Sequence, residues 1–253
     1  MDKRIKLQLK GVSKAYGRTV VLDNLDIAIS ENEFFAVLGP SGSGKSTLLK
    51  IACGHLRPER GEVIVGGKNI TGLGNRERSR EISYLPQELP KPFSFTVLDV
   101  MRTARIYMDQ DEERLIESLY ICGASHLKNR IFENLSGGEK RIVMISSLVY
   151  RGGRILMLDE PTSFLDIEKE IRILKILRNL KNEGYTIIVS IHDMSFLSRE
   201  ADDILLIKNG RPVAFGPRND VLNSGNLEKT FGITFARTPG KNTGFIPEFY
   251  VED

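Results

Sequence analysis

The stretch FFAVLGPSGSGKSTLLKI, residues 34–51, decides the fold of this 253-residue chain. Its first five residues are all apolar, which is typical of a strand covered on both faces within a parallel sheet. Gly39, Gly42 and Gly44 follow, and they allow the backbone to turn tightly. Residues 47–51 then have a helical pattern. The stretch therefore predicts a strand, a glycine-rich loop and a helix in direct succession.

The glycine-rich loop matches the phosphate-binding pattern G-x-x-x-x-G-K-[ST] at every position. In such a loop the backbone N–H groups converge on phosphate oxygens, and the helix N-terminus adds positive potential. Lys45 can reach the β and γ phosphates and assist catalysis, and Ser46 can ligate Mg²⁺. The alternative, a turn that only joins a strand to a helix, does not explain the Lys-Ser pair at this spacing. The residues expected to bind the nucleotide are Gly39, Pro40, Ser41, Gly42, Ser43, Gly44, Lys45, Ser46 and Thr47.

A second apolar run, residues 155–158, ends in two acids, Asp159 and Glu160. Asp159 can hold Mg²⁺ directly or through water. Glu160 follows at the carboxyl end of the strand, where open α/β sheets place their active sites, and can accept a proton from an attacking water. An acidic strand end or a helix cap is the alternative. The phosphate-binding loop upstream favours the catalytic interpretation.

The order of the remaining patterns predicts an α/β fold with a mainly parallel sheet. Residues 187–191 form a third apolar run, and a helical pattern at residues 173–180 separates it from the second run. Near the N-terminus, residues 5–9, 20–29 and 61–65 have strand patterns and form an expected antiparallel β portion.

Residues 88–150 differ, because helical patterns around residues 115–119 and from Gly137 onward enclose no convincing strand. We expect one domain, residues 1–253, with an inserted helical lobe at 88–150. Residues 240–253 receive no prediction.

The bulk composition fits a soluble globular protein, with 41% apolar and 27% charged residues. A net charge of +3 is too small to indicate a nucleic-acid partner. No apolar run approaches the ~20 residues that cross a bilayer, so a membrane role would need a partner chain. Cys53 and Cys122 have no metal-ligand spacing and are expected to be reduced, buried thiols.

The segment LSGGE, residues 135–139, resembles the LSGGQ signature of ABC-type ATPases and lies shortly before the acidic strand. As an alternative, Ser136 would simply cap a helix that starts at Gly137. The resemblance adds a role to that cap. It implies that Ser136, Gly137 and Gly138 bind the γ-phosphate held by the other subunit of a dimer. The N-terminus of their helix would attract this anion as the helix after the phosphate-binding loop does.

Further positions resemble the family in order and spacing, from about residue 5 to residue 232. Tyr16 resembles the aromatic residue that stacks on adenine. Gln87 resembles the glutamine that joins the two lobes and touches Mg²⁺ and water. Residues 163–166 resemble the dimer-contact loop and supply Asp166, and His192 resembles the switch histidine at the γ-phosphate.

Two residues depart from the family pattern. Glu139 replaces the usual glutamine and adds a charge beside the signature glycines. Phe164 replaces a small residue in the dimer-contact loop. Neither change removes a group that does chemistry.

The resemblance implies a P-loop NTPase fold of the ABC type and an ATPase that uses ATP and Mg²⁺. Two subunits would sandwich two ATP molecules, most economically as a homodimer. Hydrolysis would pass motion to membrane-spanning permease subunits through the groove beside Gln87. The protein would lie at the cytoplasmic face of the cell membrane, attached through the permease.

Residues 202–222 look like the end of an importer subunit, although much of this stretch is shared across ABC subunits. Residues 227–233 and 95–100 look particularly like those of the importer subgroup for iron–siderophore, haem and cobalamin uptake. An importer of this kind would also use an extracytoplasmic substrate-binding protein. The alternatives are a soluble exporter ATPase, or a non-transport ABC ATPase such as an iron–sulfur assembly subunit. Neighbouring genes for a permease and a binding lipoprotein would separate these three functions.

Overall fold

The computed structural model describes residues 4–89, 94–106, 108–192, 200–237 and 245–247. Its central feature is a six-stranded sheet with the order β10-β9-β3-β8-β7-β6. The strands are β3 (Phe34–Leu38), β6 (Ile82–Leu85), β7 (Ile155–Asp159), β8 (Thr186–Ile191), β9 (Asp203–Lys208) and β10 (Arg211–Pro217). All neighbours pair in parallel except β10, which is antiparallel to β9. The expected mainly parallel sheet is confirmed.

The continuous apolar runs of the sequence correspond to strands that are buried on both faces. In β3, Phe34, Ala36 and Leu38 point into one hydrophobic core, and Phe35 and Val37 point into another. Because side chains alternate across a strand, an apolar residue is needed at every position when both faces are covered.

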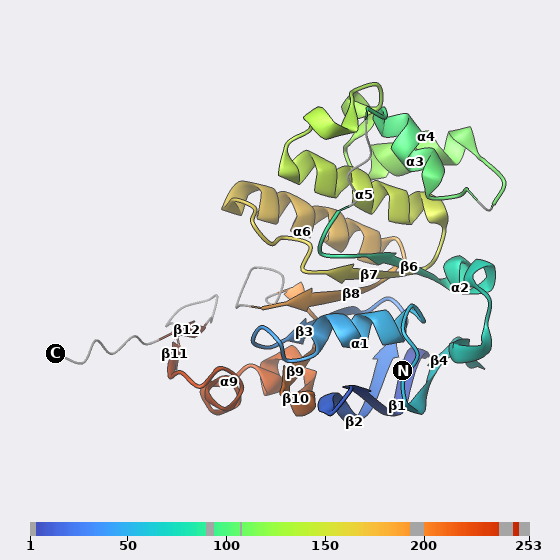
Figure 1. Ribbon diagram of the computed structural model, residues 1–253. Helices are drawn as coiled ribbons and strands as arrows, with labels where there is room; N and C mark the ends of the chain where they lie inside the picture. Colours follow the sequence, from blue (N-terminus) through green and yellow to red (C-terminus); the bar gives the residue numbers. More distant parts are fainter. Residues whose placement is uncertain (1–3, 90–93, 107, 193–199, 238–244, 248–253) are drawn as a thin grey trace.

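An antiparallel sheet with the order β2-β1-β4-β5 packs below the central sheet, and helix α1 lies between the two (Figure 1). Residues from this sheet, from α1 and from one face of the central sheet share a single hydrophobic core. The elements are β1 (Ile5–Tyr16), β2 (Thr19–Ser30), α1 (Lys45–Ala52), β4 (Arg60–Val65) and β5 (Lys68–Asn69). The expected N-terminal antiparallel portion is confirmed.

Helices α5 and α6 cover the opposite face of the central sheet (Figure 1), with α5 packed on β6 and α6 on β8. Among the described residues between β6 and β7, the only β contact is a single bridge between Thr96 and Ile131. The helices are α3 (Val97–Thr103), α4 (Glu112–Ile121), α5 (Gly137–Arg151) and α6 (Ile167–Asn182), with short 3₁₀ turns η2 (Ser125–Leu127) and η3 (Phe132–Asn134). The helical patterns at 115–119 and from Gly137 therefore fall in α4 and α5, and the limits 88–150 of a separate lobe stay a prediction.

The remaining elements are short. They are η1 (Ile70–Gly72), α2 (Asn75–Glu81), α8 (Arg218–Val221), α9 (Ser224–Phe231), β11 (Phe235–Arg237) and β12 (Phe245–Pro247). Within the described ranges, no helix is both long and apolar enough to cross a membrane.

Both cysteines are buried and free, as expected, and burial raises the pKa of each thiol to about 11. Only the thiolate is nucleophilic, so a rise from 9.0 to about 11 lowers the reactive fraction at pH 8 by about 10²-fold. We expect iodoacetamide at pH 8 to label the folded chain at least that much more slowly than the urea-unfolded chain. Rapid labelling of both thiols before unfolding, followed by mass spectrometry, would contradict this.

Candidate functional site

Parallel pairing brings the ends of four strands to one edge of the central sheet. Leu38 lies opposite Ile191, Leu85 opposite Leu158, and Asp159 opposite Ser190. The chain therefore leaves β3, β6, β7 and β8 at the same edge. The phosphate-binding loop, Gln87, Glu160 and His192 all follow these strand ends, which is where open α/β sheets bind ligands.

The phosphate-binding loop forms a cradle whose shape depends on glycine. A Cβ at Gly39 would lie 2.2 Å from the carbonyl oxygen of Ile207, so only glycine fits there. Gly44, with φ of 103°, precedes α1 and offers its N-terminus no side-chain cap. The Oγ atom of Ser43 is buried and has no hydrogen-bond partner among the described residues. The first N–H groups of α1 and this hydroxyl are thus available to an anion.

Lys45 places its ammonium group inside the cradle. Its side chain is 4% exposed, and Nζ donates to the carbonyl oxygens of Gly39 at 2.8 Å and Pro40 at 3.1 Å. The Oε1 atom of Glu160 lies 3.9 Å away. Burial lowers the pKa of Lys45, while the carboxylates of Glu160 and Asp159 act in the opposite direction. The cradle therefore holds a buried cation that an anionic ligand would stabilise.

Glu160 is held by hydrogen bonds from two loops. Its Oε2 atom accepts from Nε2 of Gln87 at 2.7 Å and from Oγ of Ser163 at 2.9 Å, which leaves Oε1 on the side of Lys45. The backbone of Glu160 has a φ of 46°, a left-handed conformation that few residues other than glycine adopt. The carboxylate is thus fixed next to the phosphate-binding loop.

Asp159 is buried at the end of β7 and accepts hydrogen bonds from two side chains that the sequence analysis did not identify. Ser190 Oγ donates to Oδ1 at 2.5 Å, and Tyr84 OH donates to Oδ2 at 3.3 Å. The same Ser190 Oγ accepts from the backbone N–H of Glu160 at 3.0 Å. Ser190 therefore fixes both acids, and the signal that could have revealed it is a single polar residue within the apolar run 187–191.

Arg141 connects the helix that follows the signature to the Gln87 loop. Its buried guanidinium donates to the carbonyl oxygens of Pro86 at 3.3 Å and Gln87 at 3.2 Å. Arg141 was not predicted from the sequence either. A cation at one position of the otherwise apolar face formed by Ile142, Ile145 and Leu148 was the available signal.

Ser136 caps α5 as expected, and Glu139 completes a capping box. Ser136 Oγ accepts from Glu139 N at 3.3 Å, and Glu139 Oε2 accepts from Ser136 N at 2.7 Å. The backbone and hydroxyl of Ser136 lower the pKa of Glu139, and Arg130 lies 3.0 Å from its Oε1. The Glu139 carboxylate therefore accepts a hydrogen bond at the N-terminus of its own helix. Ser136 and Gly137 remain exposed.

The other expected site residues lie on the surface. Tyr16 is exposed at the end of β1, and His192 is exposed directly after β8. Asp166 caps α6 by accepting from Lys169 N at 3.0 Å, and its carboxylate also pairs with the Lys169 ammonium. Phe164, beside it, is 99% exposed with a φ of 64°. The structure thus brings Lys45, Gln87, Asp159 and Glu160 together and leaves the residues expected at a dimer contact accessible.

A glycine-rich loop between a strand and a helix, with a buried lysine and two strand-end acids beside it, defines a P-loop nucleoside triphosphatase. The sequence model of the family described as ABC transporter matches residues 22–163. This chain belongs to the ABC transporter family, and it is one of the family's ATP-binding, ATP-hydrolysing subunits.

Three similar proteins illustrate the relationship. A hemin import ATP-binding protein of Pseudomonas fluorescens is 34% identical over 226 residues, which cover 86% of this chain and 89% of that protein. An inward-facing metal-chelate type ABC transporter matches with a TM-score of 0.84 and 25% identity, covering 98% of each chain. A dimeric ATP-binding cassette, in a post-hydrolysis state with ADP and Pi, matches with a TM-score of 0.75 and 27% identity, covering 84% of this chain and 98% of the other.

Proposed function

We propose that this chain is the ATPase subunit of an importer that takes up a metal chelate such as haem or an iron–siderophore complex. The observation that carries this proposal is the 34% identity with a hemin import ATP-binding protein over 86% of the chain. The likeness to a metal-chelate type transporter over 98% of the chain supports the same substrate class.

In this proposal Glu160 is the general base of ATP hydrolysis. Gln87 and Ser163 donate to one of its oxygens, so the carboxylate can accept a proton from water without moving. Lys45 and the loop from Gly39 to Thr47 hold the phosphates, and Lys45 also stabilises the charge that develops in the reaction. His192, after β8, contacts the γ-phosphate.

The residues at the end of β7 fit Mg²⁺, which prefers oxygen ligands. Asp159 supplies a carboxylate with each oxygen accepting one hydrogen bond, so that lone pairs remain for a cation. Ser46 and Gln87 add a hydroxyl and an amide oxygen. When bound, the ion would neutralise phosphate charge, while Ser190 and Tyr84 keep the Asp159 carboxylate oriented.

We further propose that the chain works as a homodimer with composite sites. Ser136, Gly137 and Gly138 open the 15-residue helix α5 with two exposed residues, which supports binding of the γ-phosphate of a second chain. The exposed Asp166 joins this contact, and Tyr16 stacks on adenine. The dimeric form of the related cassette with ADP and Pi supports this assembly.

The remaining partners follow from import. Membrane-spanning permease subunits would carry this chain at the cytoplasmic face of the membrane, and an extracytoplasmic protein would deliver the chelate. The helical segment 88–150 would act as the inserted subdomain that meets the permease. No nucleic-acid partner is proposed.

Replacing Lys45 by alanine removes the only side-chain cation of the loop, so ATP affinity and hydrolysis should both fall by at least about tenfold. The fold should persist, because Lys45 belongs to neither hydrophobic core and donates its hydrogen bonds to carbonyl oxygens of its own loop. Nucleotide titration and a phosphate-release assay check this. Normal ATP affinity in a folded variant would contradict the phosphate assignment.

The direction of transport can be tested in vesicles that contain the permease subunits and carry this chain on one side only. We expect haem or an iron–siderophore complex to move toward that side when ATP is supplied there. Vesicles with Lys45→Ala should show no movement. Movement away from the side that carries the chain would identify an exporter instead.

A further inference from the structure

Arg141 is a buried cation at the start of the second turn of α5, the helix whose first residues are proposed to bind the ATP of a second chain. It is 6% exposed, and its Nη1 atom donates to the carbonyl oxygens of Pro86 at 3.3 Å and Gln87 at 3.2 Å. Its Nη2 atom also donates to Gln87, at 3.2 Å. Among the described residues, its hydrogen-bond partners are therefore backbone carbonyls of a single loop.

The charge of Arg141 is costly to bury, because a guanidinium loses its hydration inside the fold. Burial lowers the pKa of Arg141, and the carboxylate of Asp159 acts in the opposite direction. Arginine stays protonated in proteins, so the side chain presents a fixed fork of donors to the loop. An apolar side chain would cover the same surface without this electrostatic cost. The guanidinium therefore points to a role in holding the loop.

The loop that Arg141 holds carries the side chain that orients the general base. Nε2 of Gln87 donates to Oε2 of Glu160 at 2.7 Å. The other oxygen of Glu160, Oε1, lies 3.9 Å from Nζ of Lys45 in the phosphate-binding loop. A shift of the Gln87 backbone would therefore move the carboxylate relative to the phosphates.

A second support of Glu160 limits how far the carboxylate can move. Oγ of Ser163 donates to the same Oε2 atom at 2.9 Å, and this bond does not depend on the Gln87 loop. Misplacing a reacting group by about 1 Å costs up to about 10²-fold in rate. Because Ser163 keeps its bond, we expect the loss of Arg141 to cost about tenfold.

The two ends of this part of α5 serve different ATP sites. Ser136 and Gly137 are exposed at the N-terminus, where the ATP of a second chain is proposed to bind. Arg141 lies about 6 Å further along the helix axis than Gly137 and is buried against the Gln87 loop. The contacts of Arg141 thus lead to Glu160, which lies beside the phosphate-binding loop of the same chain.

We propose that Arg141 is a positioning residue of ATP hydrolysis that acts, through Gln87, on the general base of its own chain. The inference rests on the proposed function, in which Glu160 is the base and the start of α5 serves the second chain. One helix then contributes to both sites of the dimer. Its first residues hold the partner's ATP, and Arg141 orients the base for the ATP of its own chain.

Arg141→Met removes the guanidinium and keeps an apolar side chain at the buried position. Phosphate release by the full chain in a single turnover should slow about tenfold. ATP affinity should stay within about twofold of the wild type, because the hydrogen bonds of Arg141 go to the Gln87 loop and not to the phosphate-binding loop. Arg141→Lys retains a charged donor group and should restore part of the rate.

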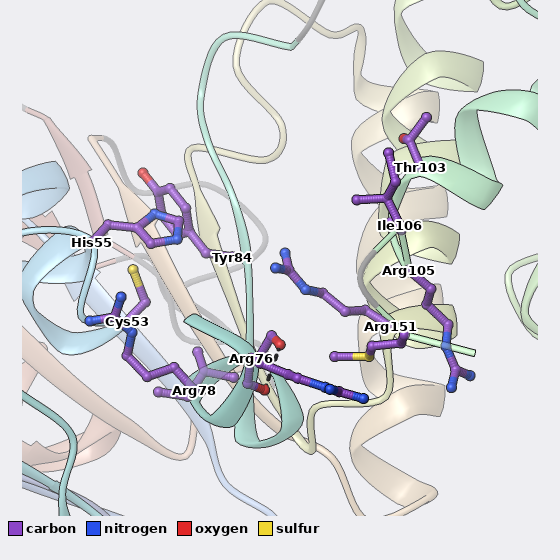
Figure 2. Close-up of a pocket in the computed structure, with 13 residues that line it drawn as sticks. Cys53, His55, Arg76, Arg78, Tyr84, Thr103, Arg105, Ile106 and Arg151 are labelled. Atoms are coloured by element: carbon purple, nitrogen blue, oxygen red, sulfur yellow. Dashed lines mark hydrogen bonds between the residues drawn. The ribbon is translucent and has the colours of Figure 1, made fainter. Parts of the chain in front are cut away.

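Arg151→Met is the matched control. Arg151 lies at the other end of α5, and its side chain lines a cavity together with His55 and Tyr84 (Figure 2). Burial lowers the pKa of Arg151 as it lowers that of Arg141. The Nε atom of Arg151 has no hydrogen-bond partner among the described residues. This variant removes the same kind of group from the same helix and should release phosphate at the wild-type rate.

Mixed dimers, purified through a different affinity tag on each chain, show in which site Arg141 acts. One chain carries Glu160→Gln, so a single turnover releases phosphate from the site of the other chain. Arg141→Met should slow this release about tenfold when it is placed on the chain that keeps Glu160. Placed on the Glu160→Gln chain, it should leave the rate within about twofold of the dimer without it.

Each result decides between the possible roles. Slower release only from the second placement would mean that Arg141 supports the signature end of α5. Equal rates in both placements, or an equal loss in Arg151→Met, would mean that Arg141 has no positioning role. Each of these results would overturn the proposal. If Arg141→Met does not fold, Arg141→Lys takes its place in both dimers.

Failure of the proposed function would look different. A mixed dimer with Glu160→Gln in one chain and no other change should release phosphate from one site. If it releases none, or if the Glu160→Gln homodimer releases phosphate at the wild-type rate, then the dimer with one base in each site is wrong, whatever Arg141 does.

Discussion

Glu160→Gln should retain ATP binding while ATP turnover falls by about 10²-fold or more. The amide has nearly the same shape, and its oxygen can still accept from Gln87 and Ser163. An amide, however, cannot take a proton from the attacking water. Since hydrolysis would no longer reopen the dimer, the variant should accumulate as an ATP-bound dimer.

Gel filtration with ATP and Mg²⁺, together with a phosphate-release assay, measures both effects. Glu168→Gln is the matched control, because it removes one carboxylate from the exposed first turn of α6. The control should hydrolyse ATP at the wild-type rate and elute at the same volume as the wild type. A Glu160→Gln protein that turns over ATP normally would remove Glu160 from the role of base.

Ser136→Arg should reduce ATPase activity on the order of 10²-fold. The loss of one group that stabilises charge in a transition state has an effect of this size. Ser136 and Gly137 are exposed, so an arginine there fits its own chain. It would collide with the ATP of a second chain and block closure. A Ser136→Arg homodimer with normal activity would show that the signature helix does not face ATP.

Mixing Ser136→Arg with Lys45→Ala tests the composite site directly. In the mixed dimer one site carries both defects, whereas the other joins the normal loop of the Ser136→Arg chain to the normal signature of the Lys45→Ala chain. If one intact site sustains closure, two inactive proteins should recover part of the activity. Recovered activity that follows the product of the fractions of the two variants, and is greatest in an equal mixture, would identify the mixed dimer as its source.

Three strands of the central sheet were predictable from the sequence, because burial on both faces requires apolar residues along the strand. A strand buried on both faces is apolar at nearly every position, so β3, β7 and β8 stood out as apolar runs. The loop residues from Gly39 to Ser46 and the two acids at the end of β7 were equally visible, because their chemistry depends on spacing along the chain.

Residues that act through pairing between distant strands were not predictable in the same way. Ser190 reaches Asp159 only because β8 lies next to β7, and Tyr84 reaches it from β6 on the other side. Arg141 bonds to carbonyl oxygens that lie 54 and 55 positions earlier in the chain. No local pattern encodes these contacts, since they depend on the order of strands and helices in space.

The left-handed backbone of Glu160 has a consequence for evolution. A non-glycine residue in that region costs about 1–2 kcal/mol relative to glycine. The backbone at position 160 therefore lowers the free energy of unfolding of a fold that is only marginally stable. Random mutation under selection for heat resistance alone should therefore favour glycine at position 160, at the expense of the acid. If evolved lineages keep glutamate at position 160, then selection acts on ATP turnover more strongly than on thermal stability.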